Sequence, residues 1–83
     1  DVIAIADDWR DGMLYVTQRN RFFAEDTVEL LAPERQPITI PLNGNLFDET
    51  GERITVANHA MMAYAFPCPV AVPKGTIVRK RAE

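Results

Sequence analysis

The sequence contains no serine, and it has only one cysteine, Cys68, and one histidine, His59. Without serine the chain has no serine nucleophile, and one cysteine cannot form a disulfide within the chain. A single histidine and a single cysteine also lack the further ligands that a zinc site needs. There is no glycine-rich phosphate-binding loop. These absences argue against a catalytic, metal or cofactor site within the 83 residues, and Cys68 is predicted to be a small buried hydrophobe.

Long apolar runs and excess positive charge are missing as well. No apolar run approaches the roughly 18 residues that a membrane-spanning helix needs, so we expect no membrane span. The net charge of −3 argues against a module that binds nucleic acid by bulk charge. One free thiol and no recognisable secretory segment predict a cytoplasmic protein.

Prolines and β-branched residues together predict an all-β domain. Six prolines leave little room for a long helix, and no stretch keeps helical apolar spacing over three turns. Short runs rich in β-branched and aromatic residues predict six or seven strands. The expected strands are 2–6, 13–19, 27–32, 36–42, 53–57, 61–66 and 76–79. A small antiparallel β-barrel, closed or nearly closed, would remove exposed sheet edges.

Local signals fix some details of this barrel. The pair Asp11-Gly12 predicts a tight reversal that joins the first two strands in a hairpin. In the second strand, Leu14 and Val16 should face one side, with Met13, Tyr15 and Thr17 on the other. Pro41 predicts an edge strand or a strand end.

The acidic residues and the single histidine are predicted to have structural roles. Asp7, Asp8 and Asp11 do not match a calcium loop, so they predict a solvated turn. Asp26 is expected to accept backbone N–H groups in a turn, and Glu29 to face water or the rim of the barrel. His59 is predicted to be a structural histidine at a strand entry.

Two groups of basic residues are the candidate binding surface. Arg19 and Arg21 adjoin Phe22, and Lys74 precedes a second group that contains Arg79 and Lys80. Basic side chains interleaved with aromatic rings suit RNA. If the groups converge on one rim, Arg19, Arg21, Phe22, Lys74, Arg79 and Lys80 bind RNA or a protein partner. The alternative is a solvated surface that offsets the acidic residues.

Five stretches, taken as an ordered set, resemble a known module. They are YVTQRNRF (15–22), EDTVELLAP (25–33), LFDETGERI (46–54), ANH (57–59) and KGTIVRK (74–80). The set resembles the C-terminal domain of peptidase family U-32, the collagenase-like proteases of bacteria. Glu25 stands where this family usually has glycine, and Ala60 where proline commonly follows the histidine, which leaves both loop conformations open.

The resemblance implies that residues 1–83 are a single C-terminal accessory β-barrel domain of a larger protein, similar to the barrels of translation elongation factors. It implies that catalysis belongs to an upstream α/β-barrel domain with its own metal-site cysteines and histidines. Members of the family are named peptidases, but some act in hydroxylation of tRNA and ribosomal RNA. The implied partners are therefore the upstream catalytic domain and an RNA or protein substrate.

Three functions remain open at this point. The first is a non-catalytic module that positions a macromolecular substrate. The second is structural docking or dimerisation through an apolar patch built from Trp9, Phe23, Phe47 or Met62. The third is a self-contained protease, which the missing serine and the unpaired Cys68 disfavour.

Overall fold

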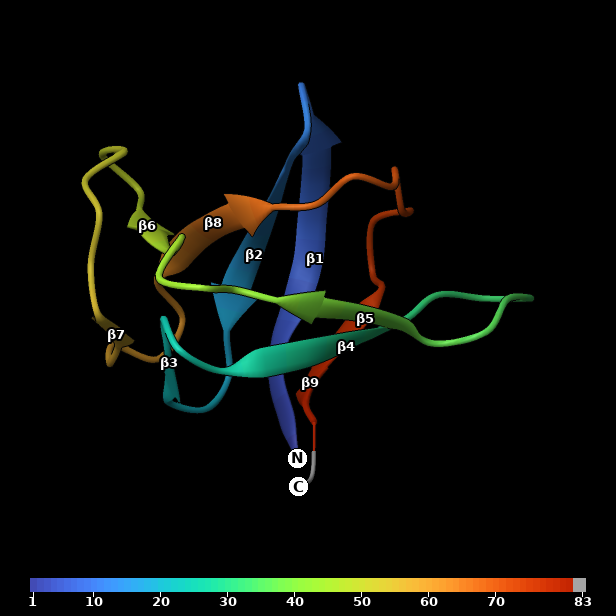
Figure 1. The fold of residues 1–83 in the computed structure, drawn as a ribbon, viewed down its shortest axis with the longest axis horizontal. Helices are drawn as coiled ribbons and strands as arrows, with labels where there is room; N and C mark the ends of the chain where they lie inside the picture. Colours follow the sequence, from blue (N-terminus) through green and yellow to red (C-terminus); the bar gives the residue numbers. More distant parts are fainter. Residues whose placement is uncertain (82–83) are drawn as a thin grey trace.

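The protein, described here from a computed structural model of residues 1–81, is built from strands with no helix in that range (Figure 1). The strands are β1 Val2–Arg10, β2 Met13–Gln18, β3 Phe22–Phe23, β4 Thr27–Leu31, β5 Ile38–Pro41, β6 Phe47–Asp48, β7 Val56–Ala57, β8 Ala63–Pro67 and β9 Ile77–Lys80. The all-β prediction is confirmed.

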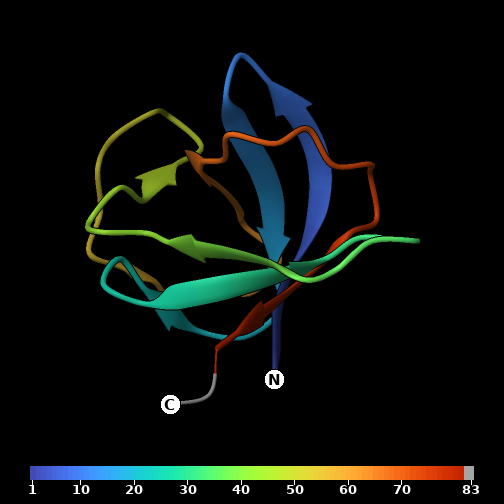
Figure 2. The same ribbon diagram turned by 45° about the vertical axis from the view of Figure 1, so that its right-hand side comes forward.

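Seven of the strands form one antiparallel sheet in the order β5-β4-β9-β1-β2-β8-β6. This sheet curls into an open half-barrel, and β3 and β7 form a separate two-stranded sheet beside it (Figures 1 and 2). The start of β1 pairs with the end of β9, so these two parts of the chain lie side by side. The predicted small barrel is therefore confirmed in its open form.

The β1–β2 hairpin forms as predicted, although β1 is longer than expected. Asp11 and Gly12 both have positive φ, 50° and 81°, which two-residue hairpin turns of type I′ require. The prediction of a solvated acidic turn is wrong for Asp7 and Asp8, which lie within β1. A bulge between Ala6 and Asp8 shifts the register there, and the Thr17 hydroxyl donates a hydrogen bond of 2.6 Å to Asp7.

Most other strands agree with the prediction to within two residues at each end, but three short strands do not. Strands β3 and β6 lie outside all the predicted strands. The predicted strand 53–57 is reduced to β7 and one bridge between Arg53 and Phe47. Strands of two residues have no run of alternating residues, so sequence periodicity cannot detect them.

The core lies inside the curl of the sheet. Along β2, buried Leu14, Val16 and Gln18 alternate with partly exposed residues, as the period of a strand requires. Leu42 and Leu46, on either side of the turn before β6, are also buried and complete the core between the two edges of the sheet. The largest fully buried side chains are Phe22, Phe66, Ile3, Leu14, Leu30, Leu42 and Leu46.

The edge strand β5 is protected by prolines. The Leu42 N–H donates to the Asp26 carbonyl (3.0 Å), and Ile40 is paired with Val28 in the same ladder. Alternation then directs the backbone groups of Ile40 toward β4 and those of Thr39 and Pro41 outward. Pro41 has no N–H, so the outward side of β5 offers a neighbouring chain a donor only at Thr39. The prediction that Pro41 marks an edge strand is confirmed.

Among residues 1–81, only Gln18 has a buried side-chain nitrogen or oxygen atom without a hydrogen-bond partner. The residue is 2% exposed and its Oε1 accepts no hydrogen bond. A buried acceptor without a partner costs about 1–3 kcal/mol of stability.

We therefore expect Gln18→Met, which keeps the length of the side chain and removes the acceptor, to raise the free energy of unfolding by about 1 kcal/mol. Urea denaturation followed by circular dichroism measures the change. Gln36→Met, at an exposed position, is the matched control and should shift stability by less than about 0.5 kcal/mol. A loss of stability in Gln18→Met would show that Oε1 is satisfied.

Candidate functional site

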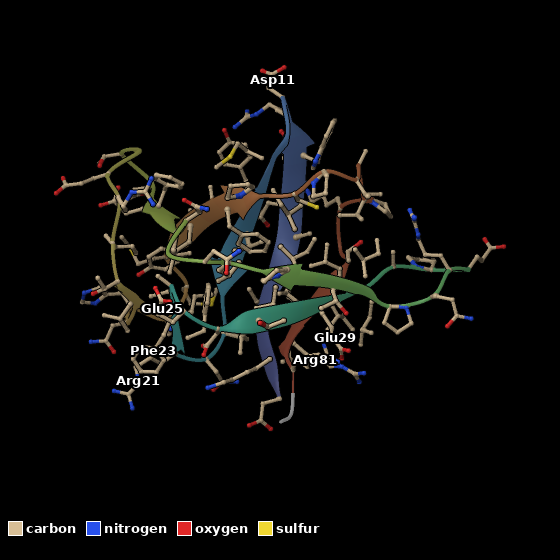
Figure 3. The ribbon with its side chains drawn as sticks, in the orientation of Figure 1. Asp11, Arg21, Phe23, Glu25, Glu29 and Arg81 are labelled. Carbon is tan, nitrogen blue, oxygen red and sulfur yellow. The ribbon has the colours of Figure 1, made fainter. Side chains whose placement is uncertain are left out.

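A ring with two cations lies at the end of the barrel where the chain begins. We call Arg21, Phe23, Asp26 and Lys80 the Phe23 cluster. The Arg21 guanidinium carbon lies 5.8 Å from the centre of the Phe23 ring, and the Lys80 ammonium is also 5.8 Å from it. Both distances lie within the range of cation–π attraction. Figure 3 shows Arg21 and Phe23 together at this end of the molecule.

The backbone explains how this cluster forms. Strand β3 presents Phe23 outward, where the ring is 42% exposed, and the Phe23 N–H donates to Asp26 Oδ2 at 2.8 Å. The predicted turn role of Asp26 is therefore confirmed. Asp26 Oδ1 also lies 3.4 Å from the Lys80 ammonium, so this carboxylate ties the turn before β4 to the end of β9.

More basic residues surround the cluster. The Arg19 N–H donates to Ile3, near the start of β1. Arg79 forms an ion pair with Glu29 at 2.9 Å, and the Arg81 N–H donates to Thr27. Within residues 1–81, Arg19, Arg21 and Arg81 form no ion pair. This end of the barrel therefore keeps cations that are free to meet an anionic partner.

Two residues of the predicted surface do not belong to it. The assignment of Phe22 is wrong, because its ring is fully buried and packs edge-on against Tyr64 with centroids 6.2 Å apart. Its neighbour Phe23 is the exposed ring. The Gly75 N–H donates a hydrogen bond to the Ala6 carbonyl, which holds the turn that contains Lys74 beside Ala6. The Lys80 N–H donates instead to the Asp1 carbonyl, before the start of β1. Lys74 is thus at the other end of β9.

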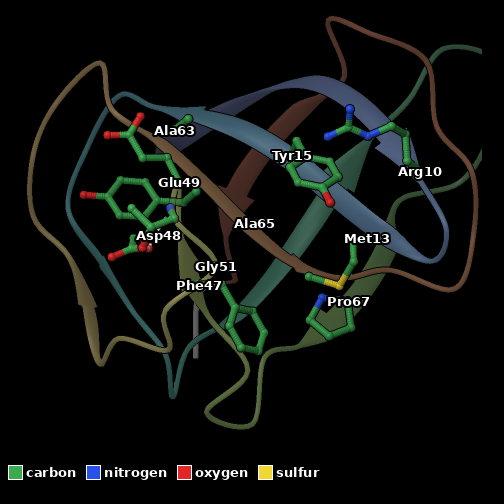
Figure 4. A pocket seen from close by; sticks show the side chains of 12 residues that line it. Arg10, Met13, Tyr15, Phe47, Asp48, Glu49, Gly51, Ala63, Ala65 and Pro67 are labelled. Carbon is green, nitrogen blue, oxygen red and sulfur yellow. Dashed lines mark hydrogen bonds between the residues drawn. The ribbon is translucent and has the colours of Figure 1, made fainter.

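A cleft of about 600 Å³ on the outer face of the sheet was not predicted. We call it the β8 groove. Tyr15 of β2, Ala65 of β8 and Phe47 of β6 are paired in one row across three strands, so the small side chain of Ala65 separates two aromatic rings (Figure 4). The groove is lined by Arg10, Met13, Tyr15, Phe47, Asp48, Glu49, Thr50, Gly51, Ala63, Tyr64, Ala65 and Pro67.

Charged groups lie along the walls of the groove. The guanidinium of Arg10 lies 4.1 Å from the centre of the Tyr15 ring, and that of Arg53 lies 5.0 Å from the Phe47 ring. Asp48 Oδ1 accepts hydrogen bonds from the Thr50 hydroxyl and the Thr50 N–H. The bond from the Thr50 hydroxyl is the main reason that the pKa of Asp48 is lowered. The Asp48 carboxylate therefore stays ionised at neutral pH.

A second cleft, of about 380 Å³, adjoins the groove and includes His59 and Met62. His59 was predicted to be a structural histidine, but the residue is exposed, so its side chain does not have that role. Its backbone N–H donates to the Tyr64 hydroxyl at 3.3 Å, and this bond holds the loop.

Cys68 is buried as predicted, at 1% exposure. Burial raises the pKa of its thiol, which donates a hydrogen bond to the Val70 carbonyl at 3.1 Å. A protonated, enclosed thiol is a poor nucleophile. Among residues 1–81, no group of three metal-binding side chains comes together, and no helix is long and apolar enough to cross a membrane.

The apolar residues proposed for a docking patch are dispersed. Trp9 packs against the core and donates its indole N–H to the Cys68 carbonyl at 2.9 Å. Phe23 lies in the cluster at the other end of the barrel, and Phe47 and Met62 line the two clefts. A different apolar row, Leu31 of β4, Ile77 of β9 and Ile5 of β1, crosses the outer face of three adjacent strands.

Two solved structures, both of the C-terminal domain of one protein, superpose on this chain. The C-terminal domain of a Geobacillus thermoleovorans protein assigned to the U32 peptidases superposes with a TM-score of 0.90 at 24% identity, covering 99% of this chain and 93% of that one. Its selenomethionine variant gives 0.88 at 24% identity, covering 96% and 99%. At this identity the likeness establishes the fold. No protein with a curated description matches the chain.

The sequence also matches a family model over residues 1–79, nearly the whole chain. That model describes the C-terminal domain of peptidase family U32, which agrees with the resemblance noted in the sequence. This chain belongs to peptidase family U32 and comprises its C-terminal domain.

Proposed function

We propose that this domain is a non-catalytic accessory module that holds RNA for the catalytic domain of a U32 protein. The observation that carries the proposal is the Phe23 cluster, an exposed ring with two cations directed at it. Unpaired bases stack on exposed aromatic rings, and neighbouring arginine and lysine side chains bind phosphates.

The distribution of charge supports the proposal despite the net charge of −3. Many carboxylates lie on the β1–β2 hairpin and around the β6 turn, whereas Glu25 and Asp26 lie in the turn directly after Phe23. Near the cluster, Asp26 and Glu29 are already paired with Lys80 and Arg79. These pairs are partly exposed, so solvent screens them and an RNA phosphate can compete for the cations.

Substitution at the Phe23 cluster should weaken RNA binding in a salt-dependent way. For the 83-residue chain titrated with tRNA, we expect Arg21→Ala and Lys80→Ala each to lower the slope of log affinity against log salt by roughly one. Phe23→Ala should weaken binding about tenfold without changing the slope, because it removes stacking.

Lys74→Ala is the matched control, since it removes the same charge at the other end of β9 and should leave affinity unchanged. Absence of binding at low salt, where phosphate contacts are strongest, would contradict the proposal. An equal effect of Lys74→Ala and Lys80→Ala would show that bulk charge is responsible for binding.

Structural docking on the catalytic domain is the second candidate, and a different feature favours it. Ile77 is 36% exposed and lies between Ile5 and Leu31 in the outer row of three strands. An apolar row of this kind on an outer face suits contact with another domain.

A charge in this row should disrupt docking. We expect Ile77→Lys to weaken binding to a separately expressed U32 catalytic domain about tenfold, because burial of one isoleucine contributes roughly 1.5–3 kcal/mol. Sedimentation velocity or calorimetry gives the affinity. Thr39→Lys, at an exposed position of β5, should have no effect. Unchanged binding by Ile77→Lys would exclude this face as the docking surface.

A further inference from the structure

The β8 groove lies away from the Phe23 cluster and is independent of the RNA proposal. Its shape limits what it can hold. Tyr15, Ala65 and Phe47 are neighbours across three strands, so the two aromatic residues are about 9.5 Å apart at their backbones. An α-helix is about 10–12 Å wide with its side chains. The space above Ala65 therefore accepts one extended chain and excludes a helix.

The floor of the groove continues along one strand. Side chains of β8 alternate, so Ala63, Ala65 and Pro67 share the outer face. They are opposite Thr17, Tyr15 and Met13 of β2. Small residues on the floor and large ones on the walls make a trough whose axis follows β8. A bound chain would lie along this axis.

The groove offers a ligand side-chain contacts rather than backbone hydrogen bonds. Strand β8 is paired with β2 on one side and, at Tyr64 and Ala65, with β6 on the other. Its backbone groups there are already used, so a peptide cannot be added as another strand. A polyproline II segment needs no backbone hydrogen bonds within itself, and its extended form is largely preorganised. Aromatic-lined grooves are the surfaces that such segments use.

The charge around the groove selects the flanking residue of the ligand. Both arginines near it, Arg10 and Arg53, already lie over aromatic rings, and Arg10 is also paired with Asp8. At the β6 end, the side chains of Asp48 and Glu49 line the groove. Glu49 is exposed and has no ion-pair partner among residues 1–81. This end favours a cation.

We propose that the β8 groove binds an extended, proline-rich peptide segment whose prolines pack between Tyr15 and Phe47 and whose flanking arginine or lysine meets Glu49.

Fluorescence anisotropy with the 83-residue chain tests this proposal. The probe is a fluorescein-labelled peptide in which a run of prolines is followed by an arginine pair. We expect it to bind at least about tenfold more tightly than a peptide of equal length with glycine and serine in place of proline, because the flexible peptide loses more conformational entropy. Replacing the arginine pair by a glutamate pair should abolish binding.

Two substitutions locate the binding site. Glu49→Lys, at an exposed position, should weaken binding of the proline–arginine peptide about fivefold. Glu34→Lys makes the same charge change at the exposed turn between β4 and β5 and should leave binding unchanged. Tyr15→Ala should weaken binding at least about tenfold, with its circular dichroism spectrum compared with that of the unsubstituted chain.

Equal affinity for the proline and glycine–serine peptides would overturn the proposal, as would equal effects of Glu49→Lys and Glu34→Lys. Competition by a uridine oligonucleotide for the peptide would assign the groove to nucleic acid instead. Loss of tRNA binding in Arg21→Ala with peptide binding intact would show that the two surfaces act separately.

Discussion

The pairing of β9 with both β1 and β4 joins the two halves of this domain. In the strand order, β9 is the only link between the β4–β5 pair and the β1–β2–β8–β6 group. Val78 makes this link apolar as well as hydrogen-bonded, because it is fully buried opposite Ala4 of β1 and Leu30 of β4. Without these four residues, the main sheet would separate into two smaller sheets, each with an uncovered apolar face.

The same short strand supplies residues to the Phe23 cluster and to the apolar row proposed for docking, and strand alternation places them on different faces. Val78 points into the core, while Ile77 and Arg79 are on the outer face. Lys80 follows at the end of the strand, where the sheet stops and its side chain reaches Asp26 and the Phe23 ring. Folding and the proposed binding are therefore coupled, since the cluster exists only when β9 is in place.

Sequence periodicity predicted the long strands well and the short ones poorly. Strand β2 could be predicted because several successive residues alternate. The Asp11-Gly12 turn could be predicted because this dipeptide meets the steric requirement of a two-residue hairpin turn. Phe22 was misassigned because β3 has only two residues, so nothing local distinguishes the buried ring from the exposed one. Lys74 and Lys80 are separated because the two ends of β9 lie beside different parts of β1. This arrangement depends on tertiary structure and not on local sequence.

The β8 groove could not have been found by the same means. The outward face of β2 was predicted, but Tyr15 becomes a wall only because Ala65 and Phe47 are paired beside it. The register between three strands that are distant in sequence decides this, and the periodicity of residues along a single strand does not reveal it. The groups of basic residues could be predicted from the sequence. The ion pairs of Lys80 with Asp26 and of Arg79 with Glu29 could not, because they depend on the tertiary structure.

The prolines of β5 have a consequence for how copies of this domain behave when crowded. Fibril growth by sheet extension needs an edge that repeats donors and acceptors along its length. Here the outward row is interrupted at Pro41, and Pro37 precedes the strand. Adjacent copies in a concentrated solution therefore meet an edge that offers a donor only at Thr39 and cannot pair continuously through it. Association at the β5 edge must therefore rely on side chains rather than on continuous backbone pairing.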